Sequence, residues 1–324
     1  MKTDLDVVAI GEAMIEFNQR PAPNDRLYFQ GFGGDTSNAM IAVARQGGKA
    51  AYISCVGDDD FGRLYCDLWR KEGVDISAVS VNPAAPTGIY FVQHDQSGHR
   101  FSYLRRGSAA SLMQPSNVPQ SLIHRARYLH VSGIGQAISE NARETVACAI
   151  QLARAGGVKI SYDPNLRPSL WSLAKAKATL LETLPLCDEF LPGLGDLQEM
   201  AGLSDPASVV TWAHHQGAKV VVLKMGDKGV LASDGHSVSE IPAFAINAVD
   251  ATGAGDCFDG AYLARRSLGF SVFDSRAGPP LPLRCQRAAM GRLTHCPPCN
   301  KSPNSFKPTI RKNLTDTWIL RFDG

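Results

Sequence analysis

The sequence predicts an α/β protein, a three-layer sandwich in which helices cover both faces of a mostly parallel central sheet, with a small antiparallel β flap. Short apolar runs alternate with helix-like stretches up to about residue 270, which is typical of parallel strands joined by helices. Two stretches, 12–33 and 87–105, break this alternation. A chain of 324 residues with 44% apolar content is long enough to bury a substantial core.

The apolar runs and the helical periods place the main elements. The predicted central strands are 6–10, 50–54, 128–131, 159–162, 189–191 and 220–223. The predicted helices are 36–45, 61–71, 139–155, 172–184 and 206–216. In sheets of this kind, ligands bind beyond the carboxyl ends of the strands, so the site is expected at that edge.

The two irregular stretches predict a lid within about 12–35 and 87–106. The first alternates apolar and polar side chains, and Thr87–His94 and Arg100–Arg105 read as a hairpin around Asp95–His99. We expect both to be antiparallel strands added to the main sheet, together forming a flap over a site. An exposed strand edge in such a flap favours pairing with a second copy, so a homo-oligomer through the lid is one expectation.

Composition argues against several classes of protein. A formal net charge of +2 disfavours a dedicated nucleic-acid or membrane-surface binder. No apolar run approaches the roughly 20 residues that cross a bilayer, and Asp4 and Asp6 stand where a signal peptide needs basic and then apolar residues. Five cysteines occur singly in apolar or helical contexts, as reduced thiols do: Cys55, Cys66, Cys148, Cys187 and Cys257. We expect a cytoplasmic protein.

The strongest chemical signal is the stretch Asp250–Ala261. Its small residues allow a tight turn that opens a helix after Asp256, and such a turn directs free N–H groups and a helix dipole at an anion such as phosphate. Asp256 is then placed to accept a proton from an attacking hydroxyl, as a base does in phosphoryl transfer. The alternative is that Asp256 only caps the helix. The length of the stretch favours the first interpretation.

A second glycine-rich turn precedes the helix that starts near Thr36. Gly33 and Gly34 would allow a sugar to approach the backbone, and Asp35 would accept hydrogen bonds from its hydroxyls. The same residues also suit a turn and helix cap, so the functional interpretation depends on the other motifs.

Three stretches in order, Gly31–Ala39, Val56–Gly62 and Asp250–Ala261, resemble the signatures of the ribokinase-like (PfkB) carbohydrate kinases. The resemblance covers about residues 5–268. It implies a ribokinase-like fold, ATP as phosphoryl donor and Mg²⁺ as cofactor. It also implies that Asp256 is the catalytic base and that Gly253, Ala254 and Gly255 form the anion hole.

The resemblance extends to the nucleotide side. Leu223–Gly229 is similar to the family's nucleotide-binding strand and turn, which assigns Lys224, Gly226 and Gly229 to nucleotide binding. The same spacing suits a tight hairpin. The family often has an Asn-x-x-Glu segment near Mg²⁺, and here Gly193 and Asp196 stand at that spacing. Asp196 either substitutes or is only the first acid of a helix, so the metal ligands stay unknown.

Two arginines suggest the substrate class. Arg105 ends the second flap strand and Arg167 follows a core strand, and guanidinium groups suit a carboxylate better than a neutral sugar. The pattern Tyr103-x-Arg105-x-Gly-Ser-Ala and the position of Arg167 resemble 2-keto-3-deoxygluconate kinases. The resemblance places Gly34, Tyr90, Tyr103, Arg105 and Arg167 around a sugar acid. An arginine at a strand end is also commonly a surface or ion-paired residue.

The chain changes character after Gly269. Residues 271–324 hold seven of the 19 prolines and nine Lys/Arg against three Asp/Glu, a net +6 that leaves −4 for residues 1–270. This segment does not resemble the adenine-pocket region of the family. We expect a kinase domain over 1–270 and an atypical tail over 271–324 that is frame-shifted, fused or disordered. A zinc site of Cys285, His295, Cys296 and Cys299 is the alternative, which the adjacency of His295 and Cys296 disfavours.

The sequence therefore predicts ATP-dependent phosphorylation of 2-keto-3-deoxygluconate to its 6-phosphate. Another sugar kinase, of the fructokinase or ribokinase type, is the alternative within the class. A sugar-acid binder with impaired catalysis is the alternative outside it, since the tail departs from the family.

Overall fold

The computed structural model describes residues 3–19, 27–95, 98–243 and 252–274. The chain divides into two compact units, Met1–Arg292 and Leu293–Gly324, and every described residue lies in the first. The predicted boundary at residue 270 stays a prediction, and the predicted zinc ligands of the tail lie outside the described residues.

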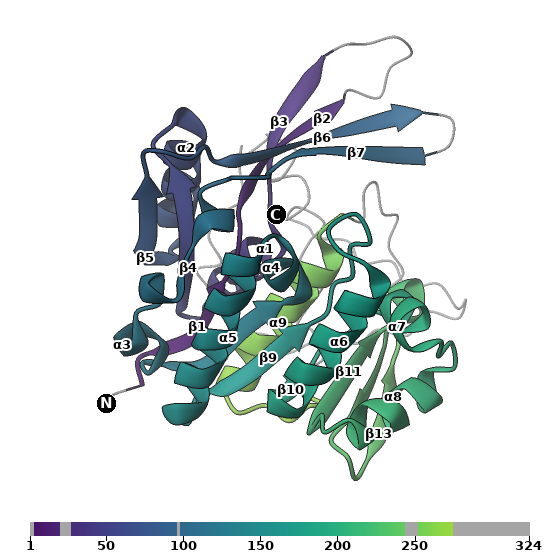
Figure 1. Cartoon of the computed structure of the whole chain (residues 1–324). Coiled ribbons are helices and arrows are strands. Elements are labelled where there is room, and N and C mark those ends of the chain that lie inside the picture. The colour runs from purple at the N-terminus through teal and green to yellow at the C-terminus, as the bar shows by residue number, and fades with distance from the viewer. Residues whose placement is uncertain (1–2, 20–26, 96–97, 244–251, 275–324) are drawn as a thin grey trace, which may run out of the picture. The chain divides into compact units, whose positions relative to one another are not determined.

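A nine-stranded sheet is the centre of the described unit, with the strand order β13-β12-β11-β10-β9-β8-β1-β4-β5 (Figure 1). Neighbouring strands from β11 to β5 are parallel, whereas β12 and β13 add an antiparallel edge. The strands are β1 Leu5–Ile10, β4 Ala50–Gly57, β5 Asp75–Asn82, β8 Ala126–Ser132, β9 Lys159–Asp163, β10 Glu189–Phe190, β11 Val220–Lys224, β12 Val230–Ser233 and β13 Val238–Ile241. The predicted mostly parallel sheet is confirmed, and the strands β5, β12 and β13 were not predicted.

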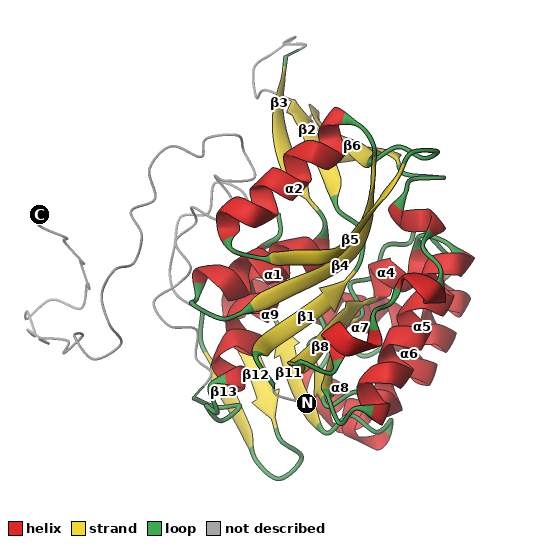
Figure 2. Ribbon diagram, turned by 90° about the vertical axis from the view of Figure 1, so that its left-hand side faces the viewer, coloured by secondary structure: helices red, strands yellow, loops and turns green. Residues whose placement is uncertain are grey.

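Helices cover both faces of this sheet, as Figure 2 shows. The helices are α1 Asp35–Arg45, α2 Asp60–Glu72, α3 Gln120–Ile123, α4 Gly133–Ala137, α5 Glu140–Ala155, α6 Leu173–Thr183, α7 Leu194–Ala201, α8 Pro206–His215 and α9 Ala254–Ser267. Among the described residues, no helix is long and apolar enough to cross a bilayer. The predicted three-layer arrangement is thus confirmed.

Alternation along the strands supplies two separate cores. On β1, Val8 and Ile10 belong to the core shared with α5, α6 and α8, whereas Val7 and Ala9 belong to the core shared with α1, α2 and α9. All four side chains are at most 2% exposed. Since successive side chains of a strand point to opposite faces, one apolar run can hold helices on both sides.

A second sheet of four strands forms the predicted lid, in the order β3-β2-β6-β7 (Figure 1). It consists of β2 Met14–Gln19, β3 Tyr28–Gly33, β6 Gly88–Asp95 and β7 Gly98–Leu104. The β2–β3 and β6–β7 pairs are antiparallel, and β2 and β6 join them in parallel. The expectation that these strands extend the main sheet was wrong, because their hydrogen bonds pair them only with one another among the described strands.

Tyr65 of α2 holds this lid to the helical layer. Its buried hydroxyl accepts a hydrogen bond from Gly33 N at 2.8 Å and lies 2.9 Å from Met14 O, to which it can donate. The two contacts join the end of β3 and the start of β2 to one side chain. The base of the lid is therefore fixed to the body.

Helices α1 and α9 pack closely against each other, so both begin at the same edge of the central sheet. Gly260 of α9 allows it: a Cβ there would meet the Ala42 Cβ at 2.7 Å and would lie still closer to the Ala39 carbonyl oxygen. A larger residue would push the helices apart, and with them the N-terminus of α9.

We predict that Gly260→Ala destabilises the protein by about 1–3 kcal/mol, because the added methyl group overpacks this contact. Urea unfolding followed by circular dichroism measures the effect. Gly195→Ala in α7 is the matched control, since the space around that helical glycine is open and the change should cost nothing and gain up to about 1 kcal/mol. Equal stability of the two variants would contradict the packing argument.

Candidate active site

A cleft of 1010 Å³ lies at the carboxyl ends of the central strands, between the lid and the start of α9. It is lined by residues from β2, β6 and β7, from the ends of β9 and β11, and from the starts of α1, α7 and α9. Eleven of the thirteen predicted site residues line it: Gly34, Asp35, Tyr90, Tyr103, Arg105, Arg167, Lys224, Gly226, Gly253, Gly255 and Asp256. Segments far apart in the sequence thus meet in one place.

The remaining two predicted residues, Ala254 and Gly229, do not line the cleft. Gly229 has φ 93° in the turn between β11 and β12, and a Cβ there would meet Ala243 N at 2.6 Å. The turn of this hairpin explains why position 229 is a glycine. Gly226, with φ 65°, borders the cleft from the same turn.

The start of α1 presents Gly34 and Asp35 to the cleft. Gly34 has φ 114°, and a Cβ on it would lie 2.5 Å from the Glu12 carbonyl oxygen, so only glycine fits. Gly34 is the N-cap, so Asp35 is not the cap. The Asp35 carboxylate accepts hydrogen bonds from Thr36 N at 2.8 Å and Asn165 Nδ2 at 3.2 Å. Burial raises its pKa.

The start of α9 forms the predicted anion site. Gly253 is the N-cap, with φ 75° and no side-chain cap, and the first intrahelical bond is from Cys257 N to Gly253 O at 2.9 Å. The N–H groups of residues 254–256 therefore have no acceptor within the helix. Asp256 does not cap the helix; its carboxylate accepts a hydrogen bond from Asn38 Nδ2 of α1 at 2.9 Å. The capping alternative is thereby corrected.

Asp256 has the electrostatics of a proton acceptor. Burial raises its pKa to about 6, and the nearby Asp35 carboxylate acts in the same direction, because ionisation places two like charges side by side. The hydrogen bond from Asn38 opposes this shift only in part. Around neutral pH the side chain is mostly ionised and still basic enough to take a proton.

Lys224, at the end of β11, lies between two carboxylates at the same edge. Its Nζ is 2.8 Å from Asp163 Oδ2 and 2.9 Å from Asp259 Oδ2. It is also 3.7 Å from where a Cβ on Gly255 would stand, so its charge is next to the start of α9. Burial opposes the charge, but the two carboxylates outweigh it and raise the Lys224 pKa. Burial raises the Asp259 pKa well above its usual range, whereas the Lys224 charge overcomes burial at Asp163 and lowers its pKa.

Aromatic side chains of the lid form the opposite wall. Tyr90 and Tyr103 stack with centroids 5.8 Å apart, and the Arg105 guanidinium lies 5.7 Å from the Tyr103 ring centroid. The Tyr90 hydroxyl donates to Glu16 of β2. Such a wall offers apolar ring faces with polar groups at their edges, which suits a sugar.

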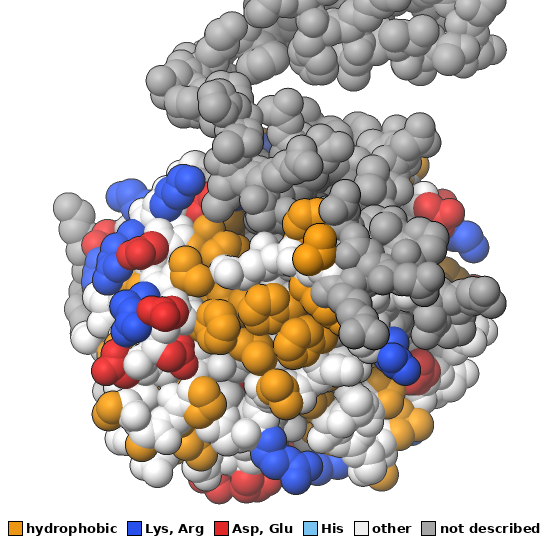
Figure 3. Space-filling model, turned by 90° about the horizontal axis from the view of Figure 1, so that it is seen from above, with side chains coloured by type: hydrophobic (Ala, Val, Ile, Leu, Met, Phe, Trp, Pro, Cys, Tyr) orange, Lys and Arg blue, Asp and Glu red, His pale blue; other side chains and the backbone are white. Residues whose placement is uncertain are grey.

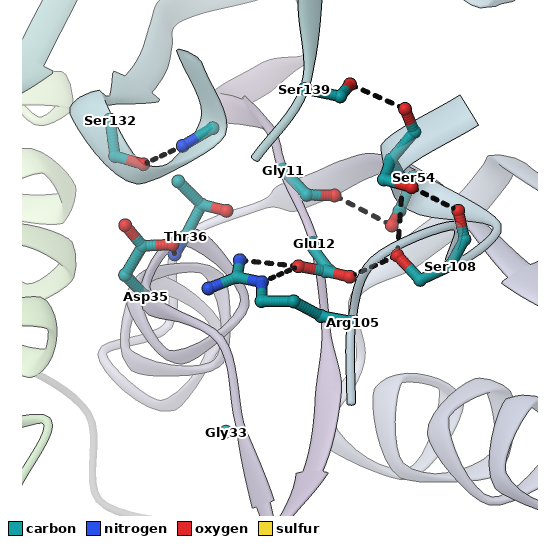
Figure 4. Close-up of polar contacts among 12 residues, drawn as sticks. Gly11, Glu12, Gly33, Asp35, Thr36, Ser54, Arg105, Ser108, Ser132 and Ser139 are labelled. Carbon is teal, nitrogen blue, oxygen red and sulfur yellow. Dashed lines mark hydrogen bonds and ion pairs between the residues drawn. The ribbon is translucent and has the colours of Figure 1, made fainter. Parts of the chain in front are cut away.

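The two predicted carboxylate-binding arginines differ in their partners. Arg105 is buried and forms an ion pair with Glu12, which Figure 4 shows. Arg167 is exposed and donates to Leu166 O at 2.8 Å. Within the described residues, no carboxylate forms an ion pair with Arg167. Arg106, the next residue in the chain after Arg105, is exposed and does not line the cleft.

Sequence reasoning missed three residues of this site: Glu12, Asn38 and Asp259. Glu12 follows the buried strand β1 after a single glycine, and a charged residue at the carboxyl end of a central strand was an available signal. Asn38 and Asp259 lie inside the two stretches already singled out. Asn38 bonds across the contact of α1 with α9, and Asp259 bonds Lys224 of β11, and no local pattern shows either contact.

The cleft has an excess of carboxylates. Six acidic residues line it (Glu12, Glu16, Asp35, Asp163, Asp196 and Asp256) against Arg105, Arg167 and Lys224, a formal charge of −3 when all are ionised. Burial raises the Asp196 pKa to about 6. In the described part of the chain, no three His, Cys, Asp or Glu side chains are grouped closely enough to hold a metal ion by themselves. This donor set fits Mg²⁺, which proteins usually hold through one or two carboxylates together with substrate phosphates.

Comparison with known proteins identifies the family. The family model for pfkB carbohydrate kinases matches residues 4–275. The chain is 35% identical to the 2-dehydro-3-deoxygluconokinase of Thermoproteus tenax over 284 residues, which cover 83% of this chain and 86% of that protein. It is 32% identical to probable fructokinase-3 of Arabidopsis thaliana, over 84% of this chain and 80% of that protein.

Solved structures agree with these relatives. A candidate ribokinase II of Escherichia coli, solved in complex with ATP and Mg²⁺, superposes with a TM-score of 0.76 at 28% identity, over 84% of this chain and 89% of that one. The nine-stranded sheet, the lid and the glycine-rich start of α9 are thus features of a known fold, and the chain belongs to the pfkB family of carbohydrate kinases.

Proposed function

We propose that this carbohydrate kinase transfers the γ-phosphoryl group of ATP to a sugar acid, 2-keto-3-deoxygluconate, and forms its 6-phosphate. The observation that carries the proposal is the position of Asp256: a carboxylate with a raised pKa, at the start of α9, in the same cleft as two arginines and two tyrosines. The similarity to 2-dehydro-3-deoxygluconokinases supports the substrate. The family supports the reaction class.

In the proposed reaction, Asp256 accepts the proton of the primary hydroxyl as its oxygen attacks the γ-phosphorus. The new oxygen–phosphorus bond forms, the bond between the γ-phosphorus and the bridging oxygen breaks, and ADP leaves with the electron pair. Asn38 holds the Asp256 carboxylate in place through its 2.9 Å hydrogen bond. Asp256 then passes the proton to solvent, and the sugar phosphate leaves.

Charge on the transferring group is stabilised from two directions. The N–H groups of residues 254–256, which have no acceptor within the helix, and the positive end of the α9 dipole lie at the Gly253–Gly255 turn. Lys224 adds a cation beside Gly255, held by Asp163 and Asp259. Gly226 borders the cleft where the β- and γ-phosphates would pass.

Mg²⁺ is the expected cofactor. Asp196 is the carboxylate that would hold it, together with the phosphates of ATP, and the ion would neutralise charge on the phosphates. The chain's own contribution is to keep Asp196 at the first turn of α7, where it lines the cleft. The crystallised neighbour with ATP and Mg²⁺ supports both ligands.

A fructokinase is the second candidate, because plant fructokinases are about as similar as the 2-dehydro-3-deoxygluconokinases. Arg167 favours the acid, since in the described part of the chain it forms no ion pair with a carboxylate, and a guanidinium suits a carboxylate better than a neutral sugar. Arg105, Tyr90, Tyr103, Gly34 and Asp35 would serve either sugar through hydrogen bonds.

The lid supports the proposal of a homo-oligomer. Large apolar side chains stay exposed on its strands: Phe29 is 45%, Phe101 42% and Leu104 64% exposed. Figure 3, which looks down on the lid side, shows hydrophobic side chains gathered on this face. A second copy of the chain would cover them.

We predict that the native chain releases ADP with 2-keto-3-deoxygluconate and that Asp256→Asn lowers kcat by roughly 10²–10⁴-fold, because the amide cannot take the hydroxyl proton. A coupled ADP-release assay, with fructose and ribose beside the acid, measures this. Calorimetry shows whether the variant still binds the sugar.

Preference for fructose would establish the second candidate instead. Acid binding without turnover in the native chain would favour the catalytically impaired binder. Full activity of Asp256→Asn would refute the assigned base.

The pH dependence of catalysis follows from the raised pKa. Asp256 must be ionised to accept the proton, so we predict that kcat/KM rises with pH and levels off above an apparent pKa of about 6. Asp196→Asn is the control, because the Asp196 carboxyl also has a pKa of about 6. A profile that loses its acidic limb in Asp196→Asn would assign the titration to Asp196.

The raised pKa of Asp256 also lowers the stability of the fold at neutral pH. An acid whose folded pKa lies above its unfolded value stabilises the fold at low pH, and this contribution is lost as pH rises through about 6. We predict that Asp256→Asn is more stable than the native chain at pH 7.5, by about 1–2 kcal/mol, and that the gain vanishes near pH 4. Thermal melts across this range measure it.

Asp205, the N-cap of α8, supplies a control of opposite sign. Hydrogen bonds from the Ser208 side chain and backbone lower its pKa, so its contribution is present at neutral pH and lost as pH falls. Asp205→Ala should therefore be less stable than the native chain at pH 7.5. The pH argument would be untenable if both variants shifted stability in the same direction.

A further inference from the structure

Glu12 stands where the connections of the lid meet. It follows β1 and leads into β2, and a Cβ on Gly34, where β3 joins α1, would lie 2.5 Å from its carbonyl oxygen. A Cβ on Gly88, at the start of β6, would lie 2.8 Å from its Oε1. Its carboxylate pairs with Arg105 at the end of β7. All four lid strands therefore connect to the body beside this one residue.

Both carboxylate oxygens of Glu12 are used (Figure 4). Oε2 accepts hydrogen bonds from Arg105 Nε at 2.8 Å and from Arg105 Nη2. Oε1 accepts one from the Ser108 hydroxyl. Glu12 is 3% exposed and Arg105 8%, so water screens the pair weakly. Ser108 belongs to the Tyr-x-Arg-x-Gly-Ser-Ala pattern, and this contact explains why that pattern extends beyond the arginine.

We propose that Glu12 is a positioning and charge-setting residue of the sugar site: it orients Arg105 toward the cleft, cancels its charge, and leaves Arg167 to distinguish an acid from a neutral sugar. The inference rests on the proposed function. It assigns the two arginines different tasks, whereas the sequence patterns assign them the same one.

The two arginines differ in the net charge that they present to a bound substrate. A substrate carboxylate beside Arg105 would also meet the negative charge of Glu12, so the pair offers it little net attraction. Arg105 lines the cleft with hydrogen-bond donors in a fixed orientation, which an acid and a neutral sugar can both use.

Arg167 also lines the cleft, and among the described residues no carboxylate forms an ion pair with it. Its charge acts on the pKa of Asp35 and Asp196, which lie nearby. Neither carboxylate is hydrogen-bonded to Arg167, so the guanidinium donors that do not bond Leu166 O can bind a substrate anion.

Calorimetry with the full-length chain tests this, with 2-keto-3-deoxygluconate and fructose as the two probes. The quantity compared is the ratio of their affinities. Arg167→Gln should weaken acid binding by about tenfold or more and change fructose binding by less than about twofold, because it removes the unpaired charge. The double variant Glu12→Gln/Arg105→Gln should weaken both sugars by similar factors, because it removes the donors of the pair and keeps its net charge at zero.

Glu12→Gln gives the sharpest test. The amide preserves shape but frees the charge of Arg105, so the ratio should shift toward the acid by about threefold to tenfold. Glu189→Gln is the matched control: Glu189 is also a buried carboxylate paired with an arginine, Arg266 at 2.8 Å, but it does not line the cleft. It should lower stability and leave the ratio unchanged.

Several outcomes would overturn the inference. An unchanged ratio in Glu12→Gln would make Glu12 only structural, and a loss of ratio in the double variant as large as in Arg167→Gln would show that Arg105 carries net charge. If melting curves show that Glu12→Gln folds poorly, the double variant, which leaves no buried unpaired charge, and Arg167→Gln decide the question. A native chain that binds no sugar acid would refute the proposed function itself, whereas acid binding with an unmoved ratio refutes only the role of Glu12.

Discussion

The close contact between α1 and α9 is the constraint on which the site depends. Gly260 lets the two helices approach beside the sheet, so their N-termini lie at the same edge. One terminus presents Asp35 and the other Asp256, and Asn38 of α1 bonds the Asp256 carboxylate. The N-terminal ends of two helices thereby meet at one edge of the cleft. Widening this contact would separate the Asp256 carboxylate from Asn38, which orients it.

That convergence also concentrates like charges. Asp35, Asp163 and Asp256 lie close enough that each influences ionisation of the others, and Lys224 compensates mainly Asp163 and Asp259. A fold optimised only for stability would avoid such a cluster, because burial of unpaired carboxylates is costly. The raised pKa of Asp256 reflects this cost, because burial disfavours the ionised carboxylate. Stability lost here is consistent with selection for a proton acceptor that works near neutral pH.

Local patterns in the sequence predicted the sheet, the principal helices and the glycine-rich turns, because each depends on periodicity or on a few neighbouring residues. They also located eleven of the residues that line the cleft. They failed where the outcome depends on distant partners. The lid forms its own sheet because β2 finds β6, about 75 positions away, and Arg105 pairs with Glu12 across 93 positions. Gly229 is a glycine because its backbone has a positive φ and lies close to the chain around Ile241, a contact that spacing alone did not show.

The difference between Arg105 and Arg167 shows why motif and geometry have to be combined when substrates are assigned. A motif records which side chains are present, but the charge that a substrate meets depends on what those side chains already bind. Arg105 and Arg167 border the same cleft, yet only one has a buried carboxylate against it. Relatives that act on acids and relatives that act on neutral sugars are almost equally similar to this chain. In our proposal the choice between them depends on the local charge balance, to which Glu12, outside the motifs recognised in the sequence, contributes at the base of the lid.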